Sequence, residues 1–563
     1  MKPGTLAAAS VLLSLGLSLW AQGPAAREPE RAPPAGDPAL ATRAERSGFL
    51  ETSSLEDVQA FLGALGARTD LLRVSSFGTS EEGRPLLLAT LSNPPVASPR
   101  ELRALGRPAV FVMANIHAGE VEGKEAVQNL MRRLTLGDLR PLLDSVVVLV
   151  APDYNVDGNE AVDVQNRTEQ HGPIAGVGRR ENARGLDLNR DYMKLDSPEA
   201  RALVRLFNDW DPQVVVDLHT TNGSYHGYHL TYSIPLNLSF EPRLLDYQRG
   251  DLMPALERAM LERHGLRTYY YGNFEGEAAA AGRPEGRTWR AFDHKPRLGQ
   301  NYVGLRNRVA ILSEAYSYLS FQERIAATER FVEEILRRAS ERGAELLSLC
   351  ADLDREFVAA ARGSSELLLG VRYEARPLAR PVPVLVGEVR HELNPQSQKP
   401  MTVALPDQYT AVEMQDFGVF APVKSVAMAR IYALEPGPAS RPIVEKLQQH
   451  GILVEELTAP LTAEVTAFSV TKLVRSERAF QNRRAVRLEG NYVQARATLE
   501  AGTPVVRLAQ PLGRLAAYLL EPESDDGLVA WGLLDASLAE GRPAPVRKIM
   551  EPAPMAARAL EAR

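Results

Sequence analysis

The chain of 563 residues contains a single cysteine, Cys350, and this scarcity limits the sites that it can build. One thiol excludes an intrachain disulfide and any zinc finger made of cysteine pairs. Cys350 lies within an apolar helical stretch, so we expect a buried and unreactive thiol. Glycine and proline, 41 and 39 residues, are too few for a collagenous or low-complexity chain. A hydrophobic content of 45% instead allows a large core.

The chain also lacks an excess of basic residues. Lys+Arg number 65 against 71 Asp+Glu, which gives a net charge of −6 and a pI near 6.0. Proteins that bind nucleic acid or an anionic membrane surface usually carry broad basic patches. We therefore expect no nucleic-acid partner.

Only one long apolar run stands out, at residues 6–20, directly after a basic start. Small residues follow it, as is typical of a secretory signal peptide. An uncleaved membrane anchor is the alternative, but the run falls short of the roughly 20 apolar residues that a span needs. We expect a signal peptide at 1–22, a secreted or periplasmic protein without a stable membrane span, and a flexible Pro- and Ala-rich leader at 23–45.

Residues 47–331 alternate short β-branched runs with helical periodicity, which is typical of α/β layering. The runs are nearly continuous, as expected for strands buried on both faces. We predict strands near 110–113, 146–150, 214–218 and 309–312, helices near 121–134 and 198–208, and a long helix or helix pair at 321–361. Residues 366–550 alternate Val-rich runs with turns. We expect an α/β catalytic domain at 46–362 and a β-rich accessory region at 363–563.

His117 and Glu120 follow a predicted buried strand and precede a predicted helix. Their spacing at a helix start places both side chains on one side. Imidazole and carboxylate suit zinc, but a catalytic zinc site needs a third ligand. His219 closes another predicted strand at a similar position, and a short spacer followed by a long one fits an open three-ligand site. Alone, the His-x-x-Glu pair is a weak signal and favours a surface or capping role.

A second cluster, residues 180–191, is dense in side chains that bind carboxylates. Asn189 and the planar donor fork of Arg190 could clamp a free chain terminus, although a solvated charged loop is an equal alternative. Glu314 ends a further predicted strand, where α/β proteins collect their ligands. A carboxylate in that place also serves often as a structural group.

Taken together and in this order, these elements resemble the carboxypeptidase A-like family of zinc metallopeptidases. The resemblance covers about residues 50–340 and implies a mixed, mostly parallel sheet flanked by helices. It also implies one zinc ion per chain, bound by His117, Glu120 and His219. Asp187 would then orient the imidazole of His117 and fix its tautomer.

The resemblance assigns the remaining roles as well. Glu314 would be the general base for water activated by zinc. Asn189 and Arg190 would bind the C-terminal carboxylate of the substrate. Arg180 would polarise the scissile carbonyl.

Two of these assignments leave alternatives open. Arg179 and Arg184 are rivals of Arg180 for the carbonyl. The mobile tyrosine of the family has no secure counterpart; Tyr302 is the nearest one in the sequence, and it suits a core or rim position equally well.

These expectations favour a zinc metallocarboxypeptidase that hydrolyses the C-terminal peptide bond of peptides with a free C-terminus. One alternative is a zinc-dependent amidohydrolase or deacylase acting on N-acyl amino acids or cell-wall peptides. Another is an inactive peptide-binding module, although the presence of every candidate ligand and of Glu314 speaks against it. The sequence assigns no chemical role to the accessory region.

Overall fold

The computed structural model describes residues 37–221, 223–276, 282–284 and 286–561. The expected signal peptide at 1–22 and the leader up to residue 36 lie outside this description. The remaining leader residues include η1 (Pro38–Leu40) and the start of α1 (Arg43–Arg46). Across the described ranges, no helix has the length and apolarity required to cross a membrane.

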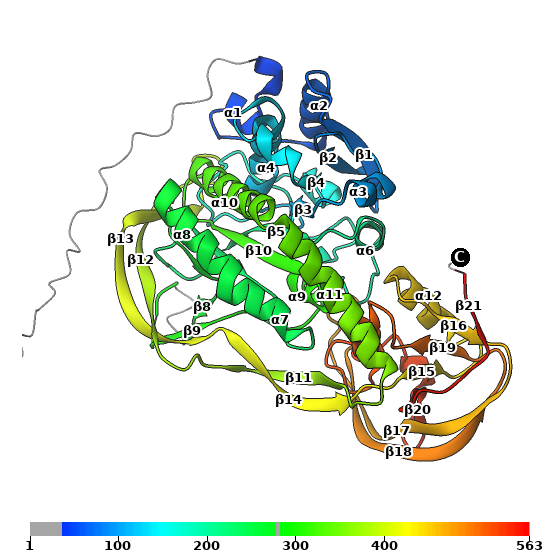
Figure 1. Cartoon of the computed structure of the whole chain (residues 1–563). Coiled ribbons are helices and arrows are strands. Elements are labelled where there is room, and N and C mark those ends of the chain that lie inside the picture. Colours follow the sequence, from blue (N-terminus) through cyan, green and yellow to red (C-terminus); the bar gives the residue numbers. More distant parts are fainter. Residues whose placement is uncertain (1–36, 222, 277–281, 285, 562–563) are drawn as a thin grey trace, which may run out of the picture. The chain divides into compact units, whose positions relative to one another are not determined.

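A mixed sheet of eight strands forms the centre of the fold (Figure 1), in the order β1-β2-β4-β3-β5-β10-β6-β7. The four central strands β4, β3, β5 and β10 run parallel to one another, as do β6 and β7, while the pairs β1–β2, β2–β4 and β10–β6 are antiparallel. This confirms the predicted mixed α/β sheet. The strands are β1 (Leu72–Thr79), β2 (Pro85–Leu91), β3 (Ala109–Ala114), β4 (Val147–Ala151), β5 (Val214–Thr221), β6 (Leu230–Ser233), β7 (Thr268–Tyr270) and β10 (Val309–Tyr316).

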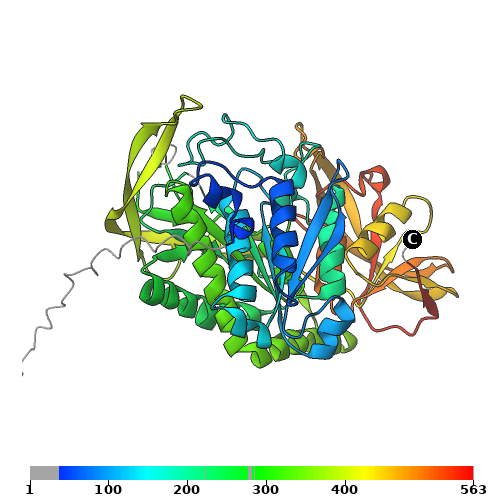
Figure 2. The same cartoon turned by 90° about the horizontal axis from the view of Figure 1, so that it is seen from above.

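Helices flank the sheet (Figure 2). Helix α4 packs against α10, which also contacts α8, whereas α6 contacts α3 and α9 packs against β5 and β10. The four central strands are buried along their whole length, as the continuous apolar runs predict. The helices are α2 (Leu55–Gly66), α3 (Pro99–Leu105), α4 (Glu122–Leu136), α5 (Val156–Asn159), α6 (Pro198–Trp210), α7 (Pro242–Tyr247), α8 (Met253–His264), α9 (Gly299–Leu305), α10 (Phe321–Glu341) and α11 (Gly343–Arg362).

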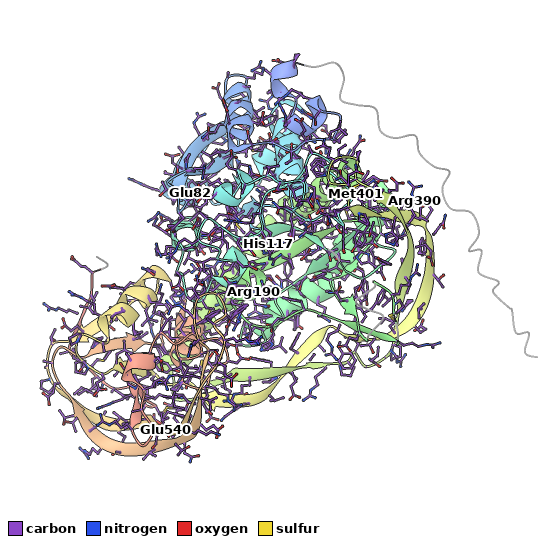
Figure 3. All side chains as sticks on the ribbon, turned by 180° about the vertical axis from the view of Figure 1, so that it is seen from behind. Glu82, His117, Arg190, Arg390, Met401 and Glu540 are labelled. Atoms are coloured by element: carbon purple, nitrogen blue, oxygen red, sulfur yellow. The ribbon has the colours of Figure 1, made fainter. Side chains whose placement is uncertain are left out.

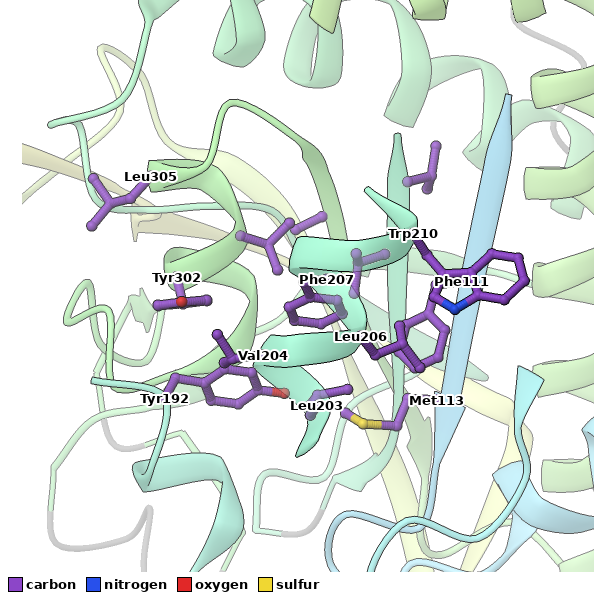
Figure 4. Close-up of a cluster of buried hydrophobic side chains, with 14 of the residues drawn as sticks. Phe111, Met113, Tyr192, Leu203, Val204, Leu206, Phe207, Trp210, Tyr302 and Leu305 are labelled. Atoms are coloured by element: carbon purple, nitrogen blue, oxygen red, sulfur yellow. The ribbon is translucent and has the colours of Figure 1, made fainter. Parts of the chain in front are cut away.

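The aromatic residues of α6 pack directly on the sheet (Figure 4). The rings of Phe207 and Phe111 meet edge to face with centroids 5.7 Å apart. Tyr302 of α9 and Tyr192 belong to the same buried cluster, with ring centroids 5.5 Å apart. This core fixes α6 and α9 against the strands whose ends carry the candidate site.

The region after α11 is β-rich, as predicted, and also contains α12 (Arg441–Gln449) and α13 (Gly513–Leu520). Its strands form two sheets of their own, with orders β11-β14 and β18-β17-β20-β15-β19-β16-β21. In a third sheet, of order β12-β13-β9-β8, strands β12 and β13 join β8 and β9, which precede α11. The strands are β8 (Asn273–Phe274), β9 (Thr288–Arg290), β11 (Leu368–Arg376), β12 (Val382–Leu393), β13 (Pro400–Phe417), β14 (Val419–Ala427), β15 (Ile431–Leu434), β16 (Glu455–Leu457), β17 (Leu461–Arg475), β18 (Val486–Leu499), β19 (Pro504–Arg507), β20 (Pro543–Ile549) and β21 (Ala557–Ala559).

This region shares structure with the α/β part of the chain. Strand β13 pairs in parallel with β9, which precedes α9 in the sequence. His450, directly after α12, also contacts the core below α9. Its ring accepts a hydrogen bond from the hydroxyl of Tyr302 at Nδ1 (2.8 Å), and its Nε2 donates to the carbonyl of Met193 (3.2 Å). His450 is completely buried, which favours the neutral imidazole. Its two hydrogen bonds connect the C-terminal region to the core of the α/β part.

The burial of His450 predicts a stability that falls in acid. Burial, with the nearby charge of Lys446, lowers the pKa of His450 to about 3. Below about pH 6.5 the unfolded chain therefore binds a proton that the folded protein does not bind until the pH approaches 3. The contribution of His450 to the free energy of unfolding is complete above pH 6.5 and is lost as the pH falls towards 3. For this one group the loss between pH 7 and 4.5 is on the order of 2–3 kcal/mol.

Denaturant unfolding of the wild type and of His450→Gln at pH 7 and 4.5 tests this expectation. The acid-induced loss should be smaller in the variant, while His391→Gln, on an exposed strand position, should behave as the wild type. Equal losses in all three proteins would contradict it.

Candidate active site

The first candidate ligands leave the end of β3. Asn115, the residue after the strand, adopts a left-handed conformation (φ 67°) and donates from its side chain to Asp153 (2.7 Å). The chain thereby turns before α4, and His117 and Glu120 lie on this turn, nearly buried. Figure 3 labels His117 and Arg190, which stand near each other in that view.

His219 and Glu314 are neighbours on adjacent parallel strands. Strand β5 carries His219 and β10 carries Glu314, and the two residues stand opposite each other in the register. Strand β3 pairs on the other side of β5, so its end lies at the same edge of the sheet. The predicted collection of ligands at the carboxyl ends of the strands is therefore what the topology provides.

His117, Glu120 and His219 form one compact group of candidate metal ligands. Their ligand atoms all lie within 4.8 Å of one another, and all three residues are buried. Nδ1 of His117 lies 3.2 Å from Nδ1 of His219 and 3.1 Å from Glu120 Oε1, while His219 Nδ1 lies 2.9 Å from Glu120 Oε2. Tetrahedral zinc with arms of about 2.0–2.1 Å separates its ligand atoms by about 3.3 Å. The donor types and spacing thus fit zinc.

A carboxylate lies behind each histidine. His117 Nε2 lies 3.1 Å from Asp187 Oδ1, and His219 Nε2 lies 3.1 Å from Asp217 Oδ2. A proton on each Nε2 leaves each Nδ1 as a free lone pair facing the centre of the group. Such carboxylate partners fix the tautomer and ring orientation of metal-binding histidines.

Two arginines, Arg180 and Arg167, contact carboxylates of this group and its surroundings. Arg180 donates to Asp187 Oδ2 through Nε (3.2 Å) and Nη2 (2.9 Å), and its Nη1 lies 3.5 Å from Glu120. Arg167 is closer still to Glu120, with a 2.9 Å hydrogen bond. The rivals of Arg180 lie elsewhere: Arg179 donates to the carbonyl of Asn182, and the exposed Arg184 faces Glu81 at 3.8 Å.

Glu314 is a further buried carboxyl group of the site. Burial raises its pKa above the usual range; the charge of Glu120 raises it further, and the charges of His219, Arg167 and Arg180 oppose the shift. A carboxyl group with a raised pKa, beside cations, is suited to take up a proton and to return it. The described residues therefore bring a group of candidate metal ligands and a carboxyl group suited to proton transfer together.

Comparison with known proteins agrees with this geometry. A family model described as zinc carboxypeptidase matches residues 58–234, the segment that contains every candidate ligand. The chain carries a zinc carboxypeptidase domain. The match ends before Glu314 and leaves the C-terminal region outside it.

Curated relatives of the zinc carboxypeptidase domain cover the same part of the chain. Carboxypeptidase D of Rattus norvegicus is 33% identical over 197 residues, which are 30% of this chain and 14% of the relative. Carboxypeptidase E of Caenorhabditis elegans is 28% identical over 169 residues, or 27% of this chain and 34% of the relative. The chain thus spans well under two thirds of the length of either protein.

Solved structures with similarity include a metallo-carboxypeptidase from Burkholderia cenocepacia, with 21% identity and a TM-score of 0.38 over 51% of this chain and 70% of that chain. A metallo-carboxypeptidase from Pseudomonas aeruginosa, solved in complex with (2-guanidinoethylmercapto)succinic acid, shows 18% identity and a TM-score of 0.37 over 52% and 70%.

Asn189 and Arg190 lie beside the candidate metal ligands, on η3 (Leu188–Arg190). The backbone N–H of Asn189 donates to Asp187 (2.9 Å), and its side-chain oxygen accepts from Gly299 N–H (3.0 Å). The guanidinium of Arg190 donates to the carbonyl of Asn189 (2.8 Å) and lies over the ring of Phe292, 5.4 Å from its centroid. Both residues therefore adjoin the segment that holds His117.

Tyr302 does not face this site, which corrects the sequence-based choice. Its side chain is completely buried in the α6–α9 core (Figure 4), and its hydroxyl donates to His450. A tyrosine that lies beside the site is Tyr271, directly after β7. Burial raises the pKa of Tyr271, and the charges of Glu314 and Glu120 raise it further. Tyr302 was predicted because it is the nearest tyrosine before Glu314 in the sequence. Tyr271 lies further away in the sequence, in the loop that follows β7.

Two further polar residues of the site, Asp217 and Arg167, were not predicted from the sequence. Asp217 precedes His219 by two positions on β5, and alternation along a strand places both on one face, so this signal was available. Arg167 comes from the irregular segment between α5 and η3, at a left-handed position (φ 49°), and no motif marks it.

Proposed function

We propose that this protein is a zinc metallocarboxypeptidase that removes the C-terminal residue of peptides with a free terminal carboxylate. His117, Glu120 and His219 would hold the zinc ion. Asp187 and Asp217 would orient the two histidines. The fit of these donors to zinc and the family match of the segment support the metal, and the position of Arg190 supports the choice of substrate.

The observation that carries the substrate class is the under-compensated charge of Arg190. Its side chain is 15% exposed, and its nearest carboxylate within the described ranges, Asp187, lies 4.0 Å away and already binds Arg180 and His117. Burial lowers the pKa of Arg190; the charges of Asp187 and Asp293 oppose this shift, and those of Arg180 and Arg297 add to it. An arriving carboxylate would complete this ion pair with two parallel hydrogen bonds.

The remaining residues supply the chemistry around the scissile bond. Bound zinc would contribute Lewis acidity to water and to a carbonyl group. Glu314 would accept a proton from the attacking water at its carboxylate and donate it to the departing amine. Arg180 and Arg167, which already face Glu120, would stabilise negative charge that develops on the carbonyl oxygen. Arg190, with Asn189 beside it, would hold the terminal residue in place.

Hydrolysis of paired peptides with free and amidated C-termini tests the proposal. Mass spectrometry should detect loss of single residues from the free peptides and slow or absent cleavage of their amidated partners. Arg190→Ala should lower kcat/KM for the free peptides about 10–100-fold, because a charged hydrogen-bonded pair is lost. Arg258→Ala, an exposed arginine on α8, serves as the matched control and should leave kcat/KM unchanged.

Other outcomes select the alternatives. Cleavage of N-acyl amino acids or cell-wall peptides, with every ordinary peptide intact, would replace the carboxypeptidase by an amidohydrolase or deacylase. Peptide binding without any hydrolysis would favour an inactive binding module. Equal cleavage of free and amidated peptides would contradict the role of Arg190.

We also propose export from the cytoplasm, which rests on the sequence of residues 1–22 alone and is tested by N-terminal sequencing of the mature protein.

A further inference from the structure

The C-terminal region reaches the candidate site through one hairpin tip, residues 476–485 between β17 and β18. At its turn, Phe480 and Arg483 exchange backbone hydrogen bonds (2.8 and 3.0 Å) around Gln481 and Asn482. Both central residues are left-handed, with φ of 51° and 60°. Side chains other than glycine adopt this conformation at an energetic cost, and such strain persists where surrounding contacts enforce it.

Gln481 makes the decisive contact. Its side-chain oxygen accepts a hydrogen bond of 2.9 Å from the backbone N–H of Asp187. Asp187 is the carboxylate that holds His117 Nε2 and pairs with Arg180. A residue nearly 300 positions later in the chain thus fixes the backbone from which the histidine's partner projects.

Two further contacts anchor the tip around Gln481. Arg483 forms a bidentate ion pair with Asp196, at 2.6 and 2.7 Å. Phe480 stacks on Trp531 with centroids 6.1 Å apart, and the guanidinium of Arg297 lies 5.5 Å from the Phe480 ring centroid. The contacts with Asp196 and Arg297 therefore anchor the tip to two segments of the α/β part, while Trp531 supports it from within the C-terminal region.

We propose that Gln481 is a positioning residue of the active site and that the C-terminal region is in this way a working part of it. By accepting from the Asp187 amide, Gln481 would hold the Asp187 carboxylate at the distance that orients His117. The region after α11 would then tune zinc affinity and turnover. This inference rests on the proposed function for the identity of the metal, but the contact itself can be tested apart from it.

Three measurements on Gln481→Ala test the proposal. Hydrogen exchange of the backbone amide at Asp187 should become faster, because its acceptor is gone. Zinc affinity, measured by chelator competition, should fall about tenfold, at the low end of the effect for partners of metal ligands. The kcat for peptide hydrolysis should fall by a similar factor while KM changes little. Gln494→Ala, an exposed glutamine on β18 of the same hairpin, is the matched control and should change none of these.

Arg483→Ala is a second test of the same contact. It removes the ion pair that anchors the tip but does not change the Gln481 side chain, so any effect comes from a loosened tip. It should shift amide exchange and zinc affinity in the same direction. Unchanged exchange at Asp187 in Gln481→Ala would overturn the contact. Faster exchange with wild-type zinc affinity and kcat would overturn the positioning role. A wild type that neither binds zinc nor cleaves peptides would instead overturn the proposed function, and the positioning role with it.

Discussion

Glu314→Gln is expected to lower kcat for peptide hydrolysis by about 10²–10⁴-fold, the usual contribution of a general acid–base group. Glutamine preserves the shape of the side chain and removes its ability to exchange a proton. Zinc content should stay near that of the wild type, because Glu314 is not among the candidate ligands. Steady-state kinetics and metal analysis on the same preparation measure both quantities.

Glu262→Gln, at an exposed position on α8, is the matched control and should retain full activity. A pH profile adds a second check, since the acid limb of kcat/KM in the wild type should disappear from the residual activity of Glu314→Gln. Retention of more than about a tenth of wild-type kcat would remove Glu314 from the role of general base.

His219→Ala is expected to weaken zinc binding on the order of a thousandfold, because one of the three proposed protein ligands is lost and the binding energy of such a site is spread over its ligands. Peptide hydrolysis should fall to background at ordinary zinc concentrations. His219 contacts both Glu120 and Asp217, so its loss also leaves two buried carboxylates without their common partner. A lower melting temperature should accompany the loss of metal.

The exposed His391 offers a control with the same substitution, His391→Ala, which should bind zinc and cleave peptides as the wild type does. Tight zinc binding by His219→Ala, with Kd within a few-fold of the wild type, would mean that the metal sits elsewhere. In that case His117 and Glu120 would need another partner.

Much of the α/β fold follows from local patterns in the sequence. The β-branched runs predict β3, β4, β5 and β10 to within a few residues, because strands buried on both faces need continuous apolar side chains. Their polar ends then predict where ligands gather. The C-terminal region was predictable only as β-rich, since the pairing of β13 with β9 joins strands from distant segments and no local pattern encodes it.

Some residues of the candidate site were likewise predictable from the sequence, and others were not. His117, Glu120 and His219 stand at strand ends, and their side-chain chemistry marks them in the sequence. Tyr302 fails because sequence separation from Glu314 says nothing about the direction of a helical side chain, and α9 turns this one into the core.

Other side chains at or near the site belong to segments that carry no recognisable motif. Tyr271 follows a short strand, Arg167 lies in irregular chain, and Gln481 belongs to a hairpin tip in the C-terminal region. Only tertiary packing reveals such contributions, because each depends on contacts far apart in the sequence.

The most direct test of the account is the location of zinc in crystals of the zinc-loaded protein by anomalous scattering at the zinc edge. We predict one strong peak per chain, within about 2.0–2.2 Å of Nδ1 of His117, Nδ1 of His219 and a carboxylate oxygen of Glu120. Glu314 should face the same ion without binding it. A zinc-loaded crystal with no peak among these three residues, or with its principal peak elsewhere, would contradict the account.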